Sequence, residues 1–96
     1  MKIYSIPDPF GESAKVSVIQ FHSFASMYKK EKSGVKPNTV RWMNDTEANE
    51  LNESNPEYIE IVELLNPGEH FMRKLADVTR FNDIVIFSWN PNQVVL

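Results

Sequence analysis

The spacing of apolar side chains along the first third of the chain predicts a strand followed by a helix. Residues 2–6 alternate in the manner of a short strand, and Pro7 confines it to an edge or an end of a sheet because proline has no N–H to donate. Farther on, apolar residues recur at steps of four and three, which keeps one helical face apolar: Ala14, Val18, Phe21, Ala25 and Tyr28. We therefore expect a helix over about residues 18–33. Residues 14–20 stay open between helix and strand, since their valines also alternate with polar neighbours.

The middle of the chain predicts two further helices. Residues 39–43 are compatible with a short strand or with the first turn of a helix. A short polar helix is expected over residues 46–53, with Asp45 or Thr46 as its cap. An Asn-Pro-Glu sequence then signals the start of a helix over residues 56–65. Apolar residues within it have helical spacing, whereas each face of a strand would mix acidic with apolar side chains: Tyr58, Ile61, Val62 and Leu65.

The last third of the chain predicts a helix and a terminal hairpin. An apolar stripe indicates a helix over residues 67–80: Phe71, Met72, Leu75 and Val78. Residues 84–89 are apolar on both faces, which is typical of a central strand, and residues 93–96 are expected to pair back against them. Together these elements predict an α+β fold, in which a short antiparallel or mixed sheet of terminal strands packs against helices. We expect residues 1–96 to form a single compact domain, because a chain of this length supports one core.

The charges divide the chain into a basic half and an acidic half, which the formal net charge of −3 conceals. Residues 1–44 carry seven bases and three acids, a net charge of +4, and residues 45–96 carry three bases and ten acids, a net charge of −7. Eight of the acids fall within residues 45–69, where there is no Lys or Arg. Such segregation bears on partners and association rates rather than on the fold.

The composition excludes several classes of protein. The chain has no cysteine, which rules out a disulfide framework, a zinc ribbon and a thiol nucleophile. Its first residues lack the apolar run of a signal peptide, and no stretch approaches the roughly 18 apolar residues of a membrane span. We therefore expect a cytoplasmic protein without a membrane partner. The oligomeric state stays open.

Candidate catalytic and metal-binding residues are few. His22 and His70 are the only imidazoles, and two histidines can serve as general acid and base, although packing or solvent alone explains their positions. The three glycines are isolated, so there is no glycine-rich phosphate loop. Residues 45–49 begin like an EF-hand loop, but Glu50 and Pro56 stand where the loop requires glycine and a closing acid. We predict neither an enzyme nor a bound metal or cofactor.

The acidic run suggests a protein-binding surface. On helices over residues 46–53 and 56–65, most of these acids would share one solvent-facing surface, which would speed encounter with a basic protein partner. The expected contact residues are the acids, with two aromatic anchors: Glu47, Glu50, Glu53, Glu57, Glu60, Glu63, Tyr58 and Trp42. The main hypothesis is a small non-enzymatic regulator or inhibitor of another protein, of the kind frequent among phage and mobile-element accessory proteins.

The basic segment before the acidic run supports an alternative, nucleic-acid binding. Residues 34–43 resemble the turn and recognition-helix half of a helix-turn-helix motif, through Gly34, Val35, Thr39, Val40 and Met43. The resemblance implies a helix that enters the major groove. The residues placed to contact phosphates or bases are Lys29, Lys30, Lys32, Lys36, Asn38 and Arg41. The same segment can also be interpreted as the end of a basic helix, a loop and a short strand with Trp42 in the core.

Overall fold

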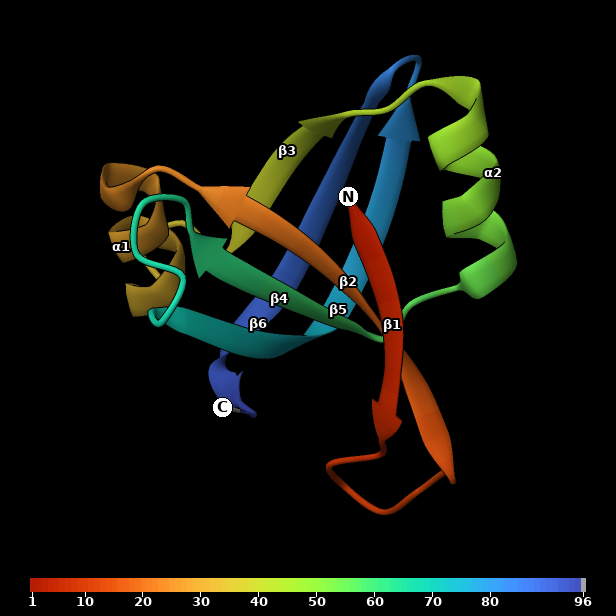
Figure 1. Ribbon diagram of the computed structural model, residues 1–96, viewed down its shortest axis with the longest axis horizontal. Helices are drawn as coiled ribbons and strands as arrows, with labels where there is room; N and C mark the ends of the chain where they lie inside the picture. The colour runs from red at the N-terminus through yellow and green to blue at the C-terminus, as the bar shows by residue number, and fades with distance from the viewer. Residues whose placement is uncertain (96) are drawn as a thin grey trace.

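The chain folds into a six-stranded mixed sheet with two helices, which confirms the expected α+β class (Figure 1). The computed structural model describes residues 1–95, without the side chain of Val94. In chain order the elements are β1 (Lys2–Pro7), β2 (Lys15–Ser23), α1 (Ala25–Ser33), β3 (Asn38–Trp42), α2 (Asp45–Ser54), β4 (Tyr58–Glu63), β5 (His70–Phe81) and β6 (Ile84–Val94). Neither helix is long and apolar enough to cross a membrane within the part of the chain that is described.

The order of the strands leaves β1 and β3 at the two edges of the sheet. Across the sheet the order is β1-β2-β4-β5-β6-β3. The pair β2–β4 is parallel, because α1, β3 and α2 all lie between these strands in the chain, and every other neighbouring pair is antiparallel. Figure 1 shows α1 at one end of the strongly twisted sheet and α2 at the other.

The two faces of the sheet carry separate apolar clusters. On the inner face, side chains of the central strands pack with both helices: Ile19, Phe21, Ile59, Ile61, Phe71, Val85, Phe87 and Trp89, with Tyr28 from α1 and Leu51 from α2. On the outer face a smaller cluster joins β2, β4 and β5: Val16, Val18, Tyr58 and Met72. Strands β2 and β4 are therefore buried on both faces, as is expected of strands flanked on both sides.

The helix expected over residues 18–33 is only half correct. Residues 15–23 form β2, which settles the open segment 14–20 as largely strand, and the helix begins at Ala25. The valines and isoleucine of β2 favour a pleated strand that is covered on both sides. The helix ends where Gly34 adopts a φ of +84°, a left-handed conformation that glycine enters without steric cost.

The helices expected over residues 56–65 and 67–80 are wrong, because both segments are strands. Residues 58–63 form β4 and residues 70–81 form β5. Strand β4 is buried on both faces, so apolar and polar residues do not alternate along it. Without that alternation, the spacing of its apolar residues happens to match that of a helix. Its β-branched side chains fit the strand, and its one central acid, Glu60, is accommodated by hydrogen bonds on the outer face.

Four other segments lie at the ends of the chain and in its middle. The strand over 2–6 and the strand over 84–89 are confirmed by β1 and β6, and residues 39–43, which were open, lie largely in β3. The separate strand over 93–96 is wrong: β6 runs on to Val94 and absorbs the Asn-Pro-Asn segment as an irregularity opposite β5. Residue 96 lies outside the described part of the chain.

Candidate functional site

Helix α2 confirms the helix expected over residues 46–53 and presents acids without a single base. Its N-cap is Asn44 rather than Asp45 or Thr46: the Asn44 side chain accepts from the backbone N–H of Glu47, and the Glu47 carboxylate accepts from the N–H of Asn44. Ala48 and Leu51 are the buried positions of the helix. The acids are half-buried or exposed on its other sides: Asp45, Glu47, Glu50 and Glu53.

The capping box is expected to support this helix measurably. Replacing Asn44 with Ala removes the acceptor for an otherwise unpaired N–H, so Asn44→Ala should lower the free energy of unfolding by about 1 kcal/mol. Urea denaturation followed by circular dichroism measures the change. Asn49→Ala is the control, because Asn49 is an exposed residue within α2, where alanine is the better helix former. Equal losses in the two variants would contradict a capping role for Asn44.

Two large aromatic side chains are exposed beside the N-terminus of α2. Trp42 at the end of β3 is 75% exposed, and Phe81 at the end of β5 is 71% exposed. Ile84 of β6 is the register partner of both, so the three side chains form one cross-strand row on the outer face of the sheet. The interpretation of the sequence that placed Trp42 in the core is therefore wrong.

A shallow depression of about 420 Å³ links the aromatic row to the helix. Trp42 and Met43 line it together with the first residues of α2 and with Asp83 from the β5–β6 turn. Arg80 of β5 lies 3.4 Å from the Asp45 carboxylate, an exposed ion pair between the hairpin and the helix. We call the region that these elements form the acidic–aromatic surface: Trp42, Phe81, Asp45, Glu47, Glu50 and Glu53.

The other residues predicted to bind a partner do not lie on this surface. Tyr58 is only 1% exposed and belongs to the outer cluster, so it is not available as an anchor. Glu60 is 9% exposed, Glu57 is exposed in the loop before β4, and Glu63 is half-buried at the other end of that strand. The continuous acidic ridge does not form, because a strand turns successive residues to opposite faces and a helix does not.

Glu60 is instead the centre of a polar cluster on the outer face of the sheet. Its Oε1 accepts from the Tyr4 hydroxyl at 2.9 Å and from Gln20 Nε2 at 2.6 Å, and its Oε2 lies 3.1 Å from Nδ1 of His70. Burial, and then the hydrogen bond to Glu60, raises the pKa of Tyr4 well above its ordinary value. This arrangement holds the His70 ring in place.

The two histidines lie on the two strands that flank β4. His22 and His70 are both register partners of Val62, from β2 on one side and β5 on the other. Two interstrand spacings place their Cα atoms about 10 Å apart. Among residues 1–95, no group of three or more His, Asp or Glu side chains is placed to hold a metal ion, and the segment that begins like an EF-hand loop is part of α2.

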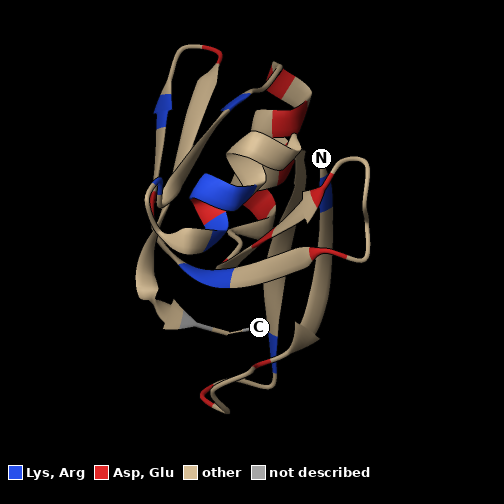
Figure 2. Ribbon diagram, turned by 90° about the vertical axis from the view of Figure 1, so that its left-hand side faces the viewer, with Lys and Arg blue, Asp and Glu red and all other residues tan. Residues whose placement is uncertain are grey.

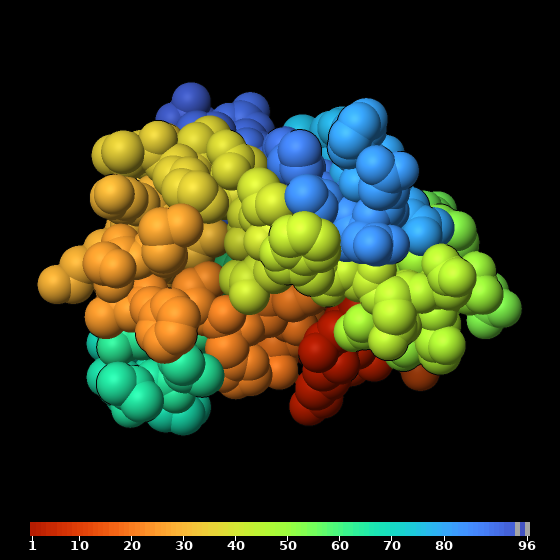
Figure 3. Space-filling model, turned by 90° about the horizontal axis from the view of Figure 1, so that it is seen from above, coloured from red at the N-terminus to blue at the C-terminus, as the bar shows by residue number. Residues whose placement is uncertain are grey.

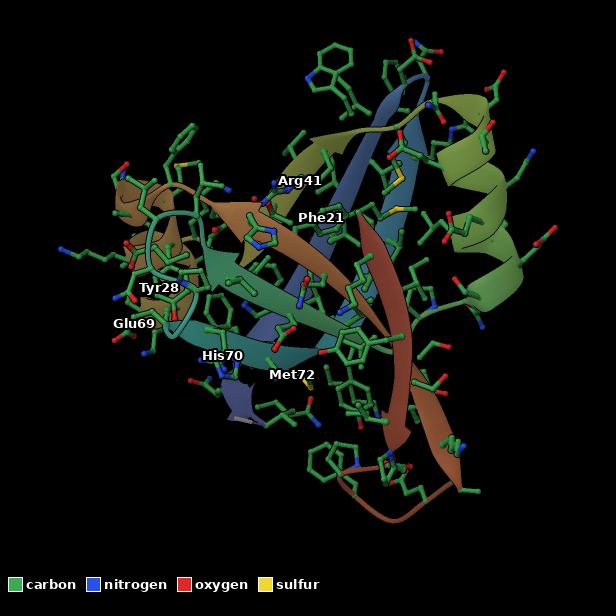
Figure 4. All side chains as sticks on the ribbon, in the orientation of Figure 1. Phe21, Tyr28, Arg41, Glu69, His70 and Met72 are labelled. Atoms are coloured by element: carbon green, nitrogen blue, oxygen red, sulfur yellow. The ribbon has the colours of Figure 1, made fainter. Side chains whose placement is uncertain are left out.

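The helix-turn-helix interpretation is wrong, because the expected recognition helix is strand β3. Arg41 is turned inwards: its guanidinium donates to Thr39 Oγ1, to the His22 carbonyl and to Ser23 Oγ, and it stacks 4.7 Å from the ring centroid of Phe21 (Figure 4). Burial lowers the pKa of Arg41, but the guanidinium stays protonated, as arginine does in proteins. A guanidinium held in this way is not presented to a phosphate.

The remaining basic residues of that segment are on or near α1. Lys36 donates to the backbone carbonyl of Asn38 and lies 3.7 Å from the Glu31 carboxylate, so it too is engaged. Helix α1 faces the viewer in Figure 2, and its lysines are exposed: Lys29, Lys30 and Lys32. The basic and acidic helices thus lie at opposite ends of the sheet (Figure 1).

Two residues of the acidic–aromatic surface, Asp45 and Phe81, are not among the contact residues expected from the sequence. Phe81 directly precedes the Asn82–Asp83 turn, where Asn82 has a positive φ of 55°. An aromatic residue at the tip of a hairpin is recognisable once β5 is assigned as a strand. Assigned to the end of a helix, Phe81 carried no signal.

Comparison of the chain with protein-family models, with curated proteins and with solved structures finds no match. The function proposed below therefore depends on the chemistry and geometry of this chain alone.

Proposed function

We propose that this chain is a small non-enzymatic regulatory or inhibitory protein that binds another protein through its acidic–aromatic surface. The observation that carries the proposal is the exposure of Trp42 and Phe81 in one cross-strand row beside an acidic helix. Tryptophan is among the residues enriched at the few positions that dominate interface energies, and it is highly buried on average, so a tryptophan that is three-quarters exposed is a candidate anchor. The proposed partner has a basic surface that fits around an apolar centre.

The charge distribution supports a partner of this kind. The acids of α2 are not interspersed with bases, so their field attracts a cationic surface and repels an anionic one. The lysines of α1 lie at the far end of the sheet and do not neutralise this field locally (Figure 1). A protein with opposite charge at its two ends is oriented before contact, which favours approach of a basic partner to the α2 end.

The proposal predicts that two variants weaken binding in different ways. Trp42→Ala removes the aromatic anchor and should weaken binding at least 30-fold, about 2 kcal/mol, mainly through faster dissociation. Glu50→Lys with Glu53→Lys should slow association and reduce its salt dependence, because rim charges act on encounter. Glu47 is left unchanged because it closes the capping box. The measurement is surface plasmon resonance with the partner captured from the native host's lysate, treated with nuclease.

The control variants make the same kinds of change, in exposed apolar surface and in net charge, at positions outside the acidic–aromatic surface. Val35→Ala removes an exposed apolar side chain, and Glu12→Lys with Glu69→Lys makes the same change in net charge. These variants should bind as the unmodified chain does. Equal effects of control and test variants would refute the proposed surface. Capture that disappears on nuclease treatment would instead indicate nucleic-acid binding by the lysines of α1.

A further inference from the structure

A pocket of about 280 Å³ lies where the end of β2, helix α1, strand β3 and the segment after β4 meet. Figure 3 looks onto this face of the molecule, with α1 in orange, β3 in olive and the segment after β4 in teal. The pocket is smaller than the roughly 300–1,000 Å³ of sites that enclose a drug-sized ligand, so it suits one side chain.

The rim of the pocket is apolar although it is exposed. Four side chains from four different segments line it, each more than a third exposed: Phe24, Met27, Val40 and Leu64. Val40 and Trp42 are two residues apart on β3 and therefore point to the same face of the strand. The rim is continuous in this way with the acidic–aromatic surface.

The floor of the pocket contains a buried carboxylate with an unused oxygen. Glu31 of α1 is 1% exposed, and its Oε1 has no hydrogen-bond partner among the described residues. Its Oε2 lies 3.7 Å from Lys36 Nζ. A buried carboxylate oxygen without a donor is costly, so the pocket favours an occupant that brings an O–H or N–H to this atom.

The surrounding charges favour a neutral donor. Lys36 and Arg41 both line the pocket beside Glu31, so its negative charge is already more than balanced, and a third cation would be repelled. An anion is not favoured either, because it would lie against the Glu31 carboxylate. Arg41 is engaged with β2 and Thr39, and Lys36 with Asn38. The complementary group has an apolar body and an uncharged hydroxyl or amide tip.

We propose that the pocket binds a tyrosine side chain of the partner protein, with the ring between the rim residues and the phenol donating to Glu31 Oε1. The phenol supplies both features that the pocket selects, since its ring covers apolar surface and its O–H forms a charge-assisted hydrogen bond to the carboxylate. The source of the tyrosine rests on the proposed protein-binding function. The selectivity of the pocket for a phenol is independent of that function.

The experiment compares three amino-acid amides on the full chain. N-acetyl-tyrosinamide, N-acetyl-phenylalaninamide and N-acetyl-lysinamide are titrated while the methyl resonances of Met27, Val40 and Leu64 are followed by NMR. We expect the tyrosine amide to bind at least tenfold more tightly than the phenylalanine amide, from which it differs by the hydroxyl alone. Glu31→Gln should reduce this ratio below threefold, because a neutral amide is a weaker acceptor.

Two further variants make the test independent of the stability of Glu31→Gln. Met27→Ala shortens the rim, so it should weaken both aromatic amides and leave their ratio above tenfold. Val78→Ala removes a similarly exposed apolar side chain on β5, away from the pocket. It should change neither the affinities for the two aromatic amides nor their ratio.

Three results would each overturn the assignment. If the affinity for the phenylalanine amide were within twofold of that for the tyrosine amide, the pocket would be an unselective apolar hollow. Tightest binding by the lysine amide would show a cation site, and unshifted rim methyls at 20 mM tyrosine amide would show a closed pocket. None of these measurements involves the partner. The pocket assignment can therefore fail while the effect of Trp42→Ala upholds the proposed function, and the converse also holds.

Discussion

Glu60→Lys is expected to lower the free energy of unfolding by about 3–5 kcal/mol, whereas Glu50→Lys is expected to change it by less than about 0.5 kcal/mol. The two glutamates belong to the same acidic run, yet Glu60 is 9% exposed within the sheet and Glu50 is exposed on α2. Lysine at position 60 leaves the donors of Tyr4 and Gln20 without an acceptor and places a cation beside them.

Urea denaturation at pH 7.5, followed by tryptophan fluorescence and circular dichroism, measures both variants. Glu53→Lys provides a second surface control with the same change in charge. Glu60→Gln separates charge from hydrogen bonding, because its side-chain oxygen still accepts while its negative charge is gone; its loss should be smaller than that of the lysine variant. If Glu60→Lys and Glu50→Lys unfolded at the same urea concentration, residue 60 would be solvent-facing and β4 would be misassigned.

The contrast between these glutamates also shows what the sequence could predict of the fold. Strand β1, helix α2 and the first part of β6 have local signals, namely a proline stop, polar cap residues and an unbroken apolar run. The three elements are confirmed, although the N-cap of α2 is Asn44 rather than Asp45 or Thr46. Strands β4 and β5 have no local signal that distinguishes them from a helix. Glu60 broke the apolar pattern of β4. A buried acid is tolerable there only because of donors from β1 and β2 and the His70 ring of β5, all distant from it in sequence or on other strands.

The candidate site was predictable only where exposure follows from local structure. Trp42 was named as an anchor from its charged neighbours and is exposed, and the acids of α2 lie on its accessible sides. Tyr58 was named as the second aromatic anchor but is buried, because β4 is central. The Glu31 pocket had no signal in the sequence. Its parts come from four segments, and the role of Arg41 in closing it depends on the approach of β3 to the end of β2.

The second large effect is expected at alkaline pH, where the protein should lose stability steeply above about pH 10. Burial is the main cause that raises the pKa of all three tyrosines, with negative neighbours as further causes: Glu60 beside Tyr4, Glu69 and Glu63 near Tyr28, and Asp8 beside Tyr58. In the unfolded chain a tyrosine loses its proton near pH 10. Between that pH and the higher folded-state pKa, the folded protein therefore binds more protons than the unfolded chain does.

A raised pKa in the folded state gives stability that is complete below pH 10 and is lost as the pH rises towards the folded-state value. Each tyrosine that ionises only on unfolding lowers the free energy of unfolding by at most about 1.4 kcal/mol per pH unit, and three together by at most about 4 kcal/mol. A domain of this size has about 5–15 kcal/mol in total, so unfolding should follow within a few pH units.

Tyrosinate absorbance at 295 nm and circular dichroism, recorded on one sample between pH 8 and 12.5, test this directly. We expect the two signals to change together, because buried phenols ionise only as the fold opens. Tyr4→Phe should remove about a third of the alkaline slope, since phenylalanine keeps the ring and cannot titrate. Tyrosinate absorbance with a midpoint near pH 10 in a chain that keeps its folded spectrum would contradict the burial of these phenols, and with it the assignment of β4 and its outer cluster.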